Sequence, residues 1–290
     1  MMALTSPAWQ DYALLDTGHG RKLERFGPIT LVRPEPQATW RPALPPADWE
    51  AADAVWEGSG AQGGHWAYRR PLPHRWEMGY RTLRFWVQAR DSRQVGVFPE
   101  NAAHWDWIAE QVRGAGRPLR VINLFGYTGL ATLAAAQAGA EVTHVDASRK
   151  AVAWGRDNQA LSGLQDRPVR WIVEDALKYL RREARRGSRY HGIVMDPPAF
   201  GRGPGGEVWQ FDRLFPALCQ ACRAVLSPEP RFVVVTVYTA GATAEALRSA
   251  VAEHLTAGLG GRLTVGEMVA VERSAGRRLR CALFARWQAG

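Results

Sequence analysis

The segment that decides the fold reads LRVINLFGYTG and covers residues 119–129. Residues 119–125 are mostly apolar and predict a buried β-strand, and Gly126 and Gly129 follow where that strand ends. The Ala-rich residues 131–138 predict a helix directly after the glycines. Because glycine lets the backbone turn tightly and approach a ligand closely, the loop is either an ordinary βα turn or a ligand-binding loop. It lacks the G-x-G-x-x-G spacing of a pyrophosphate-binding loop.

Helix and strand patterns alternate downstream of this segment, which predicts a parallel sheet with helices on both faces. A short turn separates the last two expected strands, and parallel neighbours would need a long crossover, so the last strand should run antiparallel. A dinucleotide-binding Rossmann domain has six parallel strands. The expected antiparallel last strand therefore disfavours a dehydrogenase. The expected strands are 119–125, 142–146, 169–173, 193–195, 232–238, 263–271 and 279–287, and the expected helices are 100–112, 131–138, 150–161, 177–186, 211–226 and 243–255.

Residues 1–95 differ from the rest in composition. Proline and glycine separate short apolar stretches there. Residues 28–32 and 82–88 are predicted as strands, and the Pro-rich residues 33–46 as a loop or an extended linker. The sequence therefore predicts two domains, a small β-rich domain at 1–95 and an α/β domain at 96–290. Seven tryptophans lie in the first: Trp9, Trp40, Trp49, Trp56, Trp66, Trp76 and Trp86.

The chain is basic, with a formal net charge of +9 and a pI of about 10. This balance favours a polyanionic partner such as nucleic acid, and it also fits a solvated, Arg-rich surface. Two clusters stand out, Arg181, Arg182, Arg185, Arg186 and Arg189 in one and Arg273, Arg277, Arg278 and Arg280 in the other. Both are open to either interpretation, because cations at the end of a helix also complement its dipole.

The N-terminal residues show neither a basic leader nor an apolar core of a signal peptide, and no apolar run approaches the roughly 20 residues of a membrane span. We therefore expect no membrane partner. The three cysteines, Cys219, Cys222 and Cys281, do not form a disulfide framework. A cytoplasmic location is the natural expectation.

Acidic residues follow two of the expected strands. Asp146 ends the second, about 20 residues after the first loop, and can accept both hydroxyls of a ribose. Asp175 follows the third and can accept a hydrogen bond from an adenine amino group. Either carboxylate can instead cap the helix that follows it. Ligand signals at three successive strand ends favour the binding interpretation.

The fourth strand ends in Asp196-Pro197-Pro198-Ala199-Phe200. Together with Asn123-Leu124-Phe125-Gly126-Tyr127-Thr128-Gly129, Val145-Asp146-Ala147-Ser148 and Glu174-Asp175-Ala176, this segment closely resembles the ordered motifs of class I S-adenosylmethionine-dependent methyltransferases. The nearest group is that of 23S ribosomal RNA large-subunit methyltransferases and their relatives. Residues 96–101 also resemble the segment that covers the cofactor in that group. The resemblance covers 96–290; it is specific for fold and cofactor and weak for substrate.

The resemblance implies a Rossmann-like α/β fold with a seven-stranded methyltransferase sheet whose last strand is antiparallel, and S-adenosylmethionine as cofactor. Asp196 would lie near the methyl donor, Phe98 would pack on the cofactor, and Trp105 would do so or belong with Trp107 to a helix core. The remaining cofactor contacts would come from Asn123, Phe125, Gly126, Tyr127, Thr128 and Gly129 for the methionine, Asp146, Ala147 and Ser148 for the ribose, and Asp175 and Ala176 for the adenine.

Methyl transfer from a sulfonium needs little beyond a positioned nucleophile, since the donor is already activated. Pro197 and Pro198 remove two N–H groups and stiffen the backbone. The Asp196 carboxylate and the Pro197 carbonyl are then suited to accept a substrate N–H. Phe200 could stack on an unstacked base, and its alternative is a core aromatic. The alternative for the two prolines is a rigid turn.

Carbon-5 methylation of pyrimidines needs a thiolate nucleophile, and neither the fourth nor the fifth expected strand end carries a cysteine. Cys219 and Cys222 fall three apart in an expected helix, which predicts a packed helix face better than a metal half-site, so no metal is expected. A base nitrogen becomes the better target.

The leading hypothesis is a methyltransferase that modifies a base nitrogen in ribosomal RNA, with the β-rich domain recognising the RNA. Two alternatives remain, a methyltransferase for a protein or small molecule and a non-catalytic nucleic-acid-binding module. The sequence leaves the oligomeric state unknown.

Overall fold

The computed structural model describes residues 2–7, 9–58, 63–239 and 241–290. The chain divides into two compact units. The α/β unit contains the N-terminal residues up to Leu4, Ala103–Met268 and Cys281–Gly290, and the β-rich unit contains Thr5–Ala102 and Val269–Arg280.

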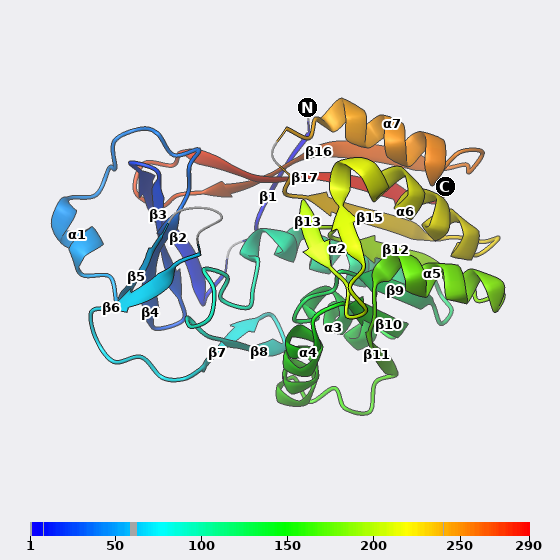
Figure 1. Ribbon diagram of the computed structural model, residues 1–290, viewed down its shortest axis with the longest axis horizontal. Coiled ribbons are helices and arrows are strands. Elements are labelled where there is room, and N and C mark those ends of the chain that lie inside the picture. The colour runs from blue at the N-terminus through cyan, green and yellow to red at the C-terminus, as the bar shows by residue number, and fades with distance from the viewer. Residues whose placement is uncertain (1, 8, 59–62, 240) are drawn as a thin grey trace. The chain divides into compact units, whose positions relative to one another are not determined.

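An eight-stranded sheet forms the centre of the α/β unit (Figure 1). From one edge to the other its strands are β11 (Val169–Val173), β10 (Glu141–Asp146), β9 (Arg120–Leu124), β12 (Gly192–Met195), β15 (Phe232–Val237), β17 (Arg278–Gln288), β16 (Arg262–Val271) and β1 (Met2–Thr5).

The strand directions confirm the fold predicted from the sequence. The five strands from β11 to β15 are parallel, and β17 pairs antiparallel with β15. The strand β1 adds an eighth member that the sequence did not predict, because four residues near the chain start show no strand-length periodicity.

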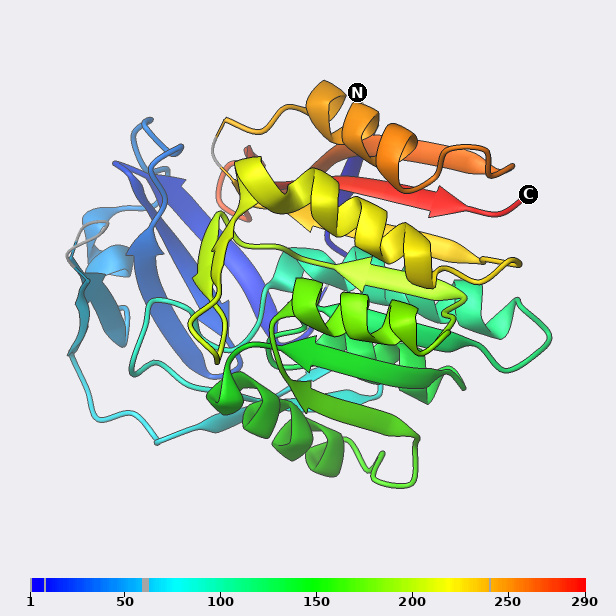
Figure 2. The ribbon, with the colours of Figure 1, turned by 45° about the vertical axis from the view of Figure 1, so that its right-hand side comes forward.

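Helices cover both faces of this sheet. Figure 2 shows α5, α6 and α7 side by side on one face. On the other face, α2 and α3 bury Ile108 and Ala135 against strand residues such as Val121 and Phe232. The helices are α2 (Ala102–Arg113, after a 3-10 turn at Pro99–Asn101), α3 (Leu130–Gln137), α4 (Arg149–Leu161), α5 (Ala176–Arg185), α6 (Phe211–Val225) and α7 (Ala244–His254).

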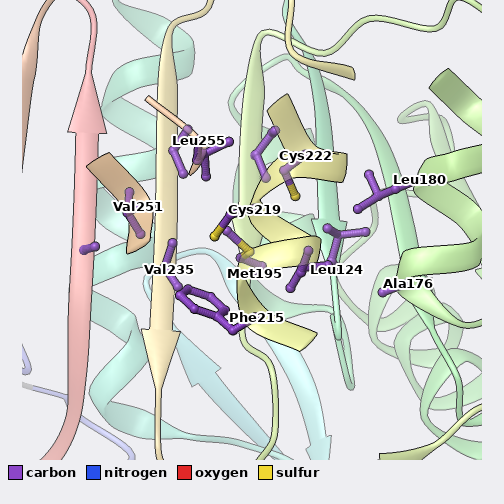
Figure 3. Close-up of a cluster of buried hydrophobic side chains, with 14 of the residues drawn as sticks. Leu124, Ala176, Leu180, Met195, Phe215, Cys219, Cys222, Val235, Val251 and Leu255 are labelled. Atoms are coloured by element: carbon purple, nitrogen blue, oxygen red, sulfur yellow. The ribbon is translucent and has the colours of Figure 1, made fainter. Parts of the chain in front are cut away.

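The larger apolar core lies between the sheet and α5, α6 and α7 (Figure 3). Cys219 and Cys222 project from α6 into this core, where both are fully buried, beside Met195 and Val235. The packed-face interpretation of the two cysteines is therefore confirmed.

The β-rich unit contains a five-stranded sheet and a separate hairpin. The strands β2, β3 and β4 are antiparallel neighbours, β5 pairs parallel with β4, and β6 pairs antiparallel with β5. Its elements are β2 (Tyr12–Gly18), β3 (Arg21–Phe26), β4 (Ile29–Pro34), α1 (Pro46–Glu50), β5 (Ala54–Glu57), β6 (His65–Tyr68), β7 (Trp76–Tyr80) and β8 (Leu83–Val87).

The compact units differ from the division at 95/96 because the tip of the last hairpin belongs to the β-rich unit. The backbone N–H of Arg273 donates to Leu14 O (2.9 Å) and that of Ser274 to Leu15 O (3.1 Å). The buried Glu272 carboxylate accepts a hydrogen bond from Thr17 and pairs with Arg277 (3.1 Å). A linear division of the sequence cannot capture such a return of the chain.

None of the helices in the described ranges has both the length and the apolar character that a membrane crossing requires.

Candidate active site

Parallel pairing brings the motif-bearing strand ends to one edge of the sheet. Leu124 lies beside both Val145 and Met195, and Asp146 lies beside Val173. Ligands of open α/β sheets bind beyond this carboxyl edge. The structure thus gathers the predicted segments there: 125–129, 146–148, 174–176 and 196–200.

The loop after β9 adopts an unusual backbone. Phe125 (φ 54°), Tyr127 (φ 50°) and Gly129 (φ 84°) all lie in the left-handed region. For a non-glycine residue this conformation costs about 1–3 kcal/mol and persists only where the surroundings enforce it. The loop leads into the N-terminus of α3, whose dipole favours an anionic group. Such a loop suits the carboxylate of a bound amino acid.

The Asp146 carboxylate stabilises this loop. Its Oδ2 accepts a hydrogen bond from the backbone N–H of Tyr127 (2.8 Å), and its Oδ1 accepts one from that of Ser148 (2.8 Å). Burial raises the pKa of Asp146 above its ordinary value, more than these two N–H groups lower it. Each oxygen keeps further lone pairs, so the carboxylate can also accept from two ribose hydroxyls.

A buried polar network lies beneath the loop. Asn123 Nδ2 donates to Thr132 Oγ1 (2.9 Å), which also contacts His144 Nδ1 (3.0 Å). Burial lowers the pKa of His144 to about 3, so the imidazole is neutral. Because Asn123 is only 3% exposed, we infer that it supports the loop from below and does not wrap the methionine directly. A Cβ on Gly126 would lie 2.4 Å from the His144 ring, so only glycine fits there.

Two further residues fix the end of the loop. Thr128 is buried, and its carbonyl accepts a hydrogen bond from Asn158 Nδ2 (3.0 Å). A Cβ on Gly129 would lie 2.7 Å from the Trp171 ring. These contacts fix the backbone of the loop at its end.

Asp146 and Asp175, which the sequence offered as possible helix caps, differ in this respect. Asp175 is the N-cap of α5, because its Oδ1 accepts from the backbone N–H of Lys178 (2.8 Å). Asp146 is not a cap, since Ser148 takes that role for α4 by accepting from Ala151 N (3.2 Å). The second oxygen of Asp175 remains suited to an adenine amino group.

The Asp196-Pro197-Pro198 segment starts from β12, where Asp196 N donates to Leu124 O (3.3 Å). Asp196 is half-buried, Pro197 is buried and Pro198 is exposed. Phe200 is 54% exposed, so the core-aromatic alternative is wrong.

A short hairpin follows these prolines, between the expected strand 193–195 and the expected helix 211–226. It pairs β13 (Phe200–Arg202) with β14 (Val208–Gln210). The indole N–H of Trp209 donates to Pro198 O (2.6 Å), and Phe211 N donates to Ala199 O (3.0 Å). The Trp209 ring also packs on Phe125, with centroids 5.0 Å apart. Trp209 thus links the proline segment to the loop after β9.

We predict that Trp209→Phe lowers kcat while leaving cofactor affinity nearly unchanged. The substitution keeps an aromatic ring beside Phe125 and removes the hydrogen bond to Pro198 O. A net hydrogen bond is worth about 0.5–1.5 kcal/mol, so kcat should fall about 2- to 10-fold. Steady-state kinetics and calorimetry measure the two quantities.

The matched control for this variant is Trp76→Phe, which removes an equivalent indole bond to Phe26 O (2.9 Å) in the β-rich unit. It should lower stability without lowering kcat. An equal loss of kcat in both variants would show that Trp209 acts only through stability.

The two aromatic residues predicted upstream lie in different units. Phe98 belongs to the β-rich unit, directly before the 3-10 turn at Pro99–Asn101. Trp105 is 4% exposed on α2, and the Trp107 ring meets that of Phe232 edge-on at 5.8 Å. The burial of Trp105 and the packing of the partly buried Trp107 against the core support the helix-core alternative for both tryptophans.

Sequence reasoning missed Thr132, His144, Trp171 and Trp209. Each acts through a partner that belongs to another element or loop, which no local pattern shows. Within the described ranges no three His, Cys, Asp or Glu side chains are grouped as metal ligands would be.

The groups at this edge fit S-adenosylmethionine. Asp146 offers a pair of acceptors for the ribose hydroxyls, and Asp175 offers an acceptor for the adenine amino group. The N-terminus of α3 offers the positive end of the helix dipole to the carboxylate of the methionine part.

Comparison with known proteins agrees with this fit. The S-adenosylmethionine-dependent methyltransferase family matches residues 59–230. The crystal structure of the SAM-dependent methyltransferase from Agrobacterium tumefaciens is 44% identical, with a TM-score of 0.96, over 100% of this chain and 94% of that one.

Two curated relatives are named ribosomal RNA large subunit methyltransferase K/L. The protein from Chromohalobacter salexigens is 36% identical over 43% of this chain, and that from Shewanella baltica is 43% identical over 37%. The matches span only 16% and 14% of those longer proteins. With the family match and the Agrobacterium structure, the conclusion is that this chain belongs to the S-adenosylmethionine-dependent methyltransferase family and uses S-adenosylmethionine as its cofactor.

Proposed function

We propose that the chain methylates a nitrogen of a base in ribosomal RNA. The observation that carries the proposal is the juxtaposition of Asp196 and Pro197 with the exposed ring of Phe200 at the cofactor edge. The names of the curated relatives support RNA as the acceptor, and the net charge of +9 suits a polyanion.

The chain's own groups would position the acceptor. S-adenosylmethionine supplies an activated methyl group when bound. Asp196 and the Pro197 carbonyl accept hydrogen bonds from the amino or ring N–H of the base, which aims its nitrogen lone pair at the donor. Phe200 stacks on the base, a contact worth about 1–3 kcal/mol for nucleic-acid bases on aromatic rings. The rigid proline backbone keeps these acceptors in place.

The N-terminal region 1–95 is proposed to contribute to RNA recognition. It combines many aromatic residues with cations, including Arg75, whose guanidinium lies 4.2 Å from the ring centroid of Trp86. Such mixtures suit single-stranded nucleic acid. A cytoplasmic location follows from the proposed ribosomal substrate.

A transfer assay with radiolabelled S-adenosylmethionine tests this function. Purified protein is incubated with a lysate from a strain that lacks its gene, and the product is divided and treated with ribonuclease or with protease. Label that ribonuclease releases supports the proposal. Label released by protease, or left in the small-molecule fraction, would assign a different acceptor class.

The nitrogen target predicts that the cysteines are dispensable. Burial raises the pKa of Cys219 to about 12 and that of Cys222 well above its ordinary value, so both thiols stay protonated and unreactive. A folded Cys219→Ala, Cys222→Ala, Cys281→Ala variant should keep wild-type kcat in the transfer assay.

Circular dichroism establishes that the triple variant is folded. Loss of turnover in that folded variant, together with a covalent RNA–protein adduct in the wild type alone, would restore carbon-5 chemistry.

A further inference from the structure

The hairpin β13–β14 has two unlike faces. Phe200 pairs with Gln210 and Arg202 with Val208. Side chains alternate between the two faces of a strand, so Phe200, Arg202 and Val208 share one face and Trp209 points to the other. Exposure agrees, since Phe200 is 54% and Val208 49% exposed while Trp209 is 3% exposed. We call Phe200, Arg202 and Val208 the outer face.

The outer face concentrates exposed apolar side chains. Among the described residues, the other large hydrophobic side chains with high exposure are Met2, Tyr68 and Val271, each on a different strand. Single exposed hydrophobic residues are common on protein surfaces. Two exposed hydrophobic side chains, Phe200 and Val208, on a hairpin whose strands have only three residues each are not explained by folding. Arg202 lies opposite Val208 and is exposed. The outer face therefore combines an aromatic ring, an aliphatic side chain and a guanidinium.

Several contacts hold this hairpin in place. Trp209 and the backbone N–H of Phe211 bind the carbonyls of Pro198 and Ala199. At the other end, Lys178 of α5 pairs with Glu207 (2.9 Å), whose second oxygen accepts from Gly205 N (2.8 Å). A surface held in this way loses less conformational entropy when it binds a ligand. In Figure 1 the two strands form the yellow-green pair beside the label β13.

We propose that the outer face binds single-stranded RNA next to the methylated base, with Arg202 on a phosphate and Val208 on the neighbouring base. This inference rests on the proposed function and adds two residues and an RNA conformation to it. Guanidinium groups bind phosphate with two hydrogen bonds, and apolar side chains cover the faces of unstacked bases. Bases inside an A-form duplex do not present their faces, so a duplex cannot use Phe200 and Val208.

The test measures binding of a fluorescein-labelled, mixed-sequence 12-nucleotide RNA by anisotropy, as a single strand and as a blunt duplex. Arg202→Gln should weaken single-strand binding about 3- to 10-fold, and the slope of log K against log salt should shrink by about 0.7, the value for one phosphate. Val208→Asp should weaken it to a similar extent by placing a carboxylate against the RNA. Cofactor affinity should not change in either variant.

Matched controls carry the same substitutions at other exposed positions, Arg262→Gln at the start of β16 and Val271→Asp at its end. Both should leave single-strand affinity within about twofold of wild type, because neither lies on the outer face. Equal losses in Arg202→Gln and Arg262→Gln would reduce the effect to net charge and overturn the proposal. Equal losses on the duplex would do the same.

Failure of this inference is distinguishable from failure of the proposed function. If the wild type methylates ribosomal RNA and both outer-face variants bind and methylate it normally, only the outer-face assignment is wrong. If the wild type neither binds RNA nor transfers label to it, both are wrong. An acidic peptide that competes for Arg202 while RNA does not would assign the face to a protein partner instead.

Discussion

Asp196→Ala should abolish methyl transfer and leave S-adenosylmethionine affinity within about twofold of wild type, because the variant loses an interaction with the acceptor alone. Asp196 is half-buried at the end of β12, directly before the buried Pro197. In the proposed mechanism, the base is no longer held in line with the donor once this carboxylate is removed. Loss of such alignment costs at least about 100-fold in rate. Single-turnover kinetics and calorimetry check the two quantities.

Asp196→Asn is the informative companion to this variant. It keeps one oxygen as a hydrogen-bond acceptor and removes the charge, so turnover between that of the Asp196→Ala variant and that of the wild-type protein supports an acceptor role. Full turnover in Asp196→Ala would remove Asp196 from the mechanism. A parallel loss of cofactor affinity would move the residue to the cofactor site.

Asp146→Ala should weaken S-adenosylmethionine binding by about 1–3 kcal/mol, or about 5- to 150-fold. The variant removes the proposed acceptor pair for the ribose and also the hydrogen bonds from Tyr127 N and Ser148 N that support the loop. Isothermal titration calorimetry measures the change. Asp166→Ala, an exposed aspartate in the turn between α4 and β11, is the matched control and should bind normally.

The pH dependence of binding gives an independent test of Asp146. In the proposed site the ionised carboxylate accepts the ribose hydroxyls, and burial raises its pKa above the ordinary aspartate value. A raised pKa means that the group becomes protonated at a higher pH than an exposed aspartate. Affinity should therefore decrease as pH falls through this raised pKa, while folding is still intact. In Asp146→Ala this part of the pH dependence should disappear, as calorimetry across a pH series would show.

The sequence predicts the sheet well because each parallel strand carries its own local signal. The expected strand at 169–173 coincides with β11, and the short turn after 271 correctly predicts an antiparallel β17. The hairpin β13–β14 was missed because its strands have three residues each, too few for a period. It is held by Trp209, a tertiary contact that no local pattern shows.

The candidate site, like the fold, could be predicted only in part from the sequence. The motifs at the strand ends are contiguous in sequence, so Asp146, Asp175 and Asp196 could be placed at one edge from the strand order alone. The support beneath them depends on pairs such as Asn123 with Thr132 and Gly126 with His144, where a close approach decides the residue type. Packing of this kind follows from the folded backbone and not from a periodicity.

The most direct test of base-nitrogen methylation in ribosomal RNA is mass-spectrometric nucleoside mapping of that RNA from a strain that lacks the gene. We predict that one nitrogen-methylated nucleoside is absent, and that the wild-type protein restores it whereas Asp196→Ala does not. An unchanged set of modified nucleosides, or the loss of a carbon-5-methylated pyrimidine, would contradict base-nitrogen methylation of ribosomal RNA by this protein.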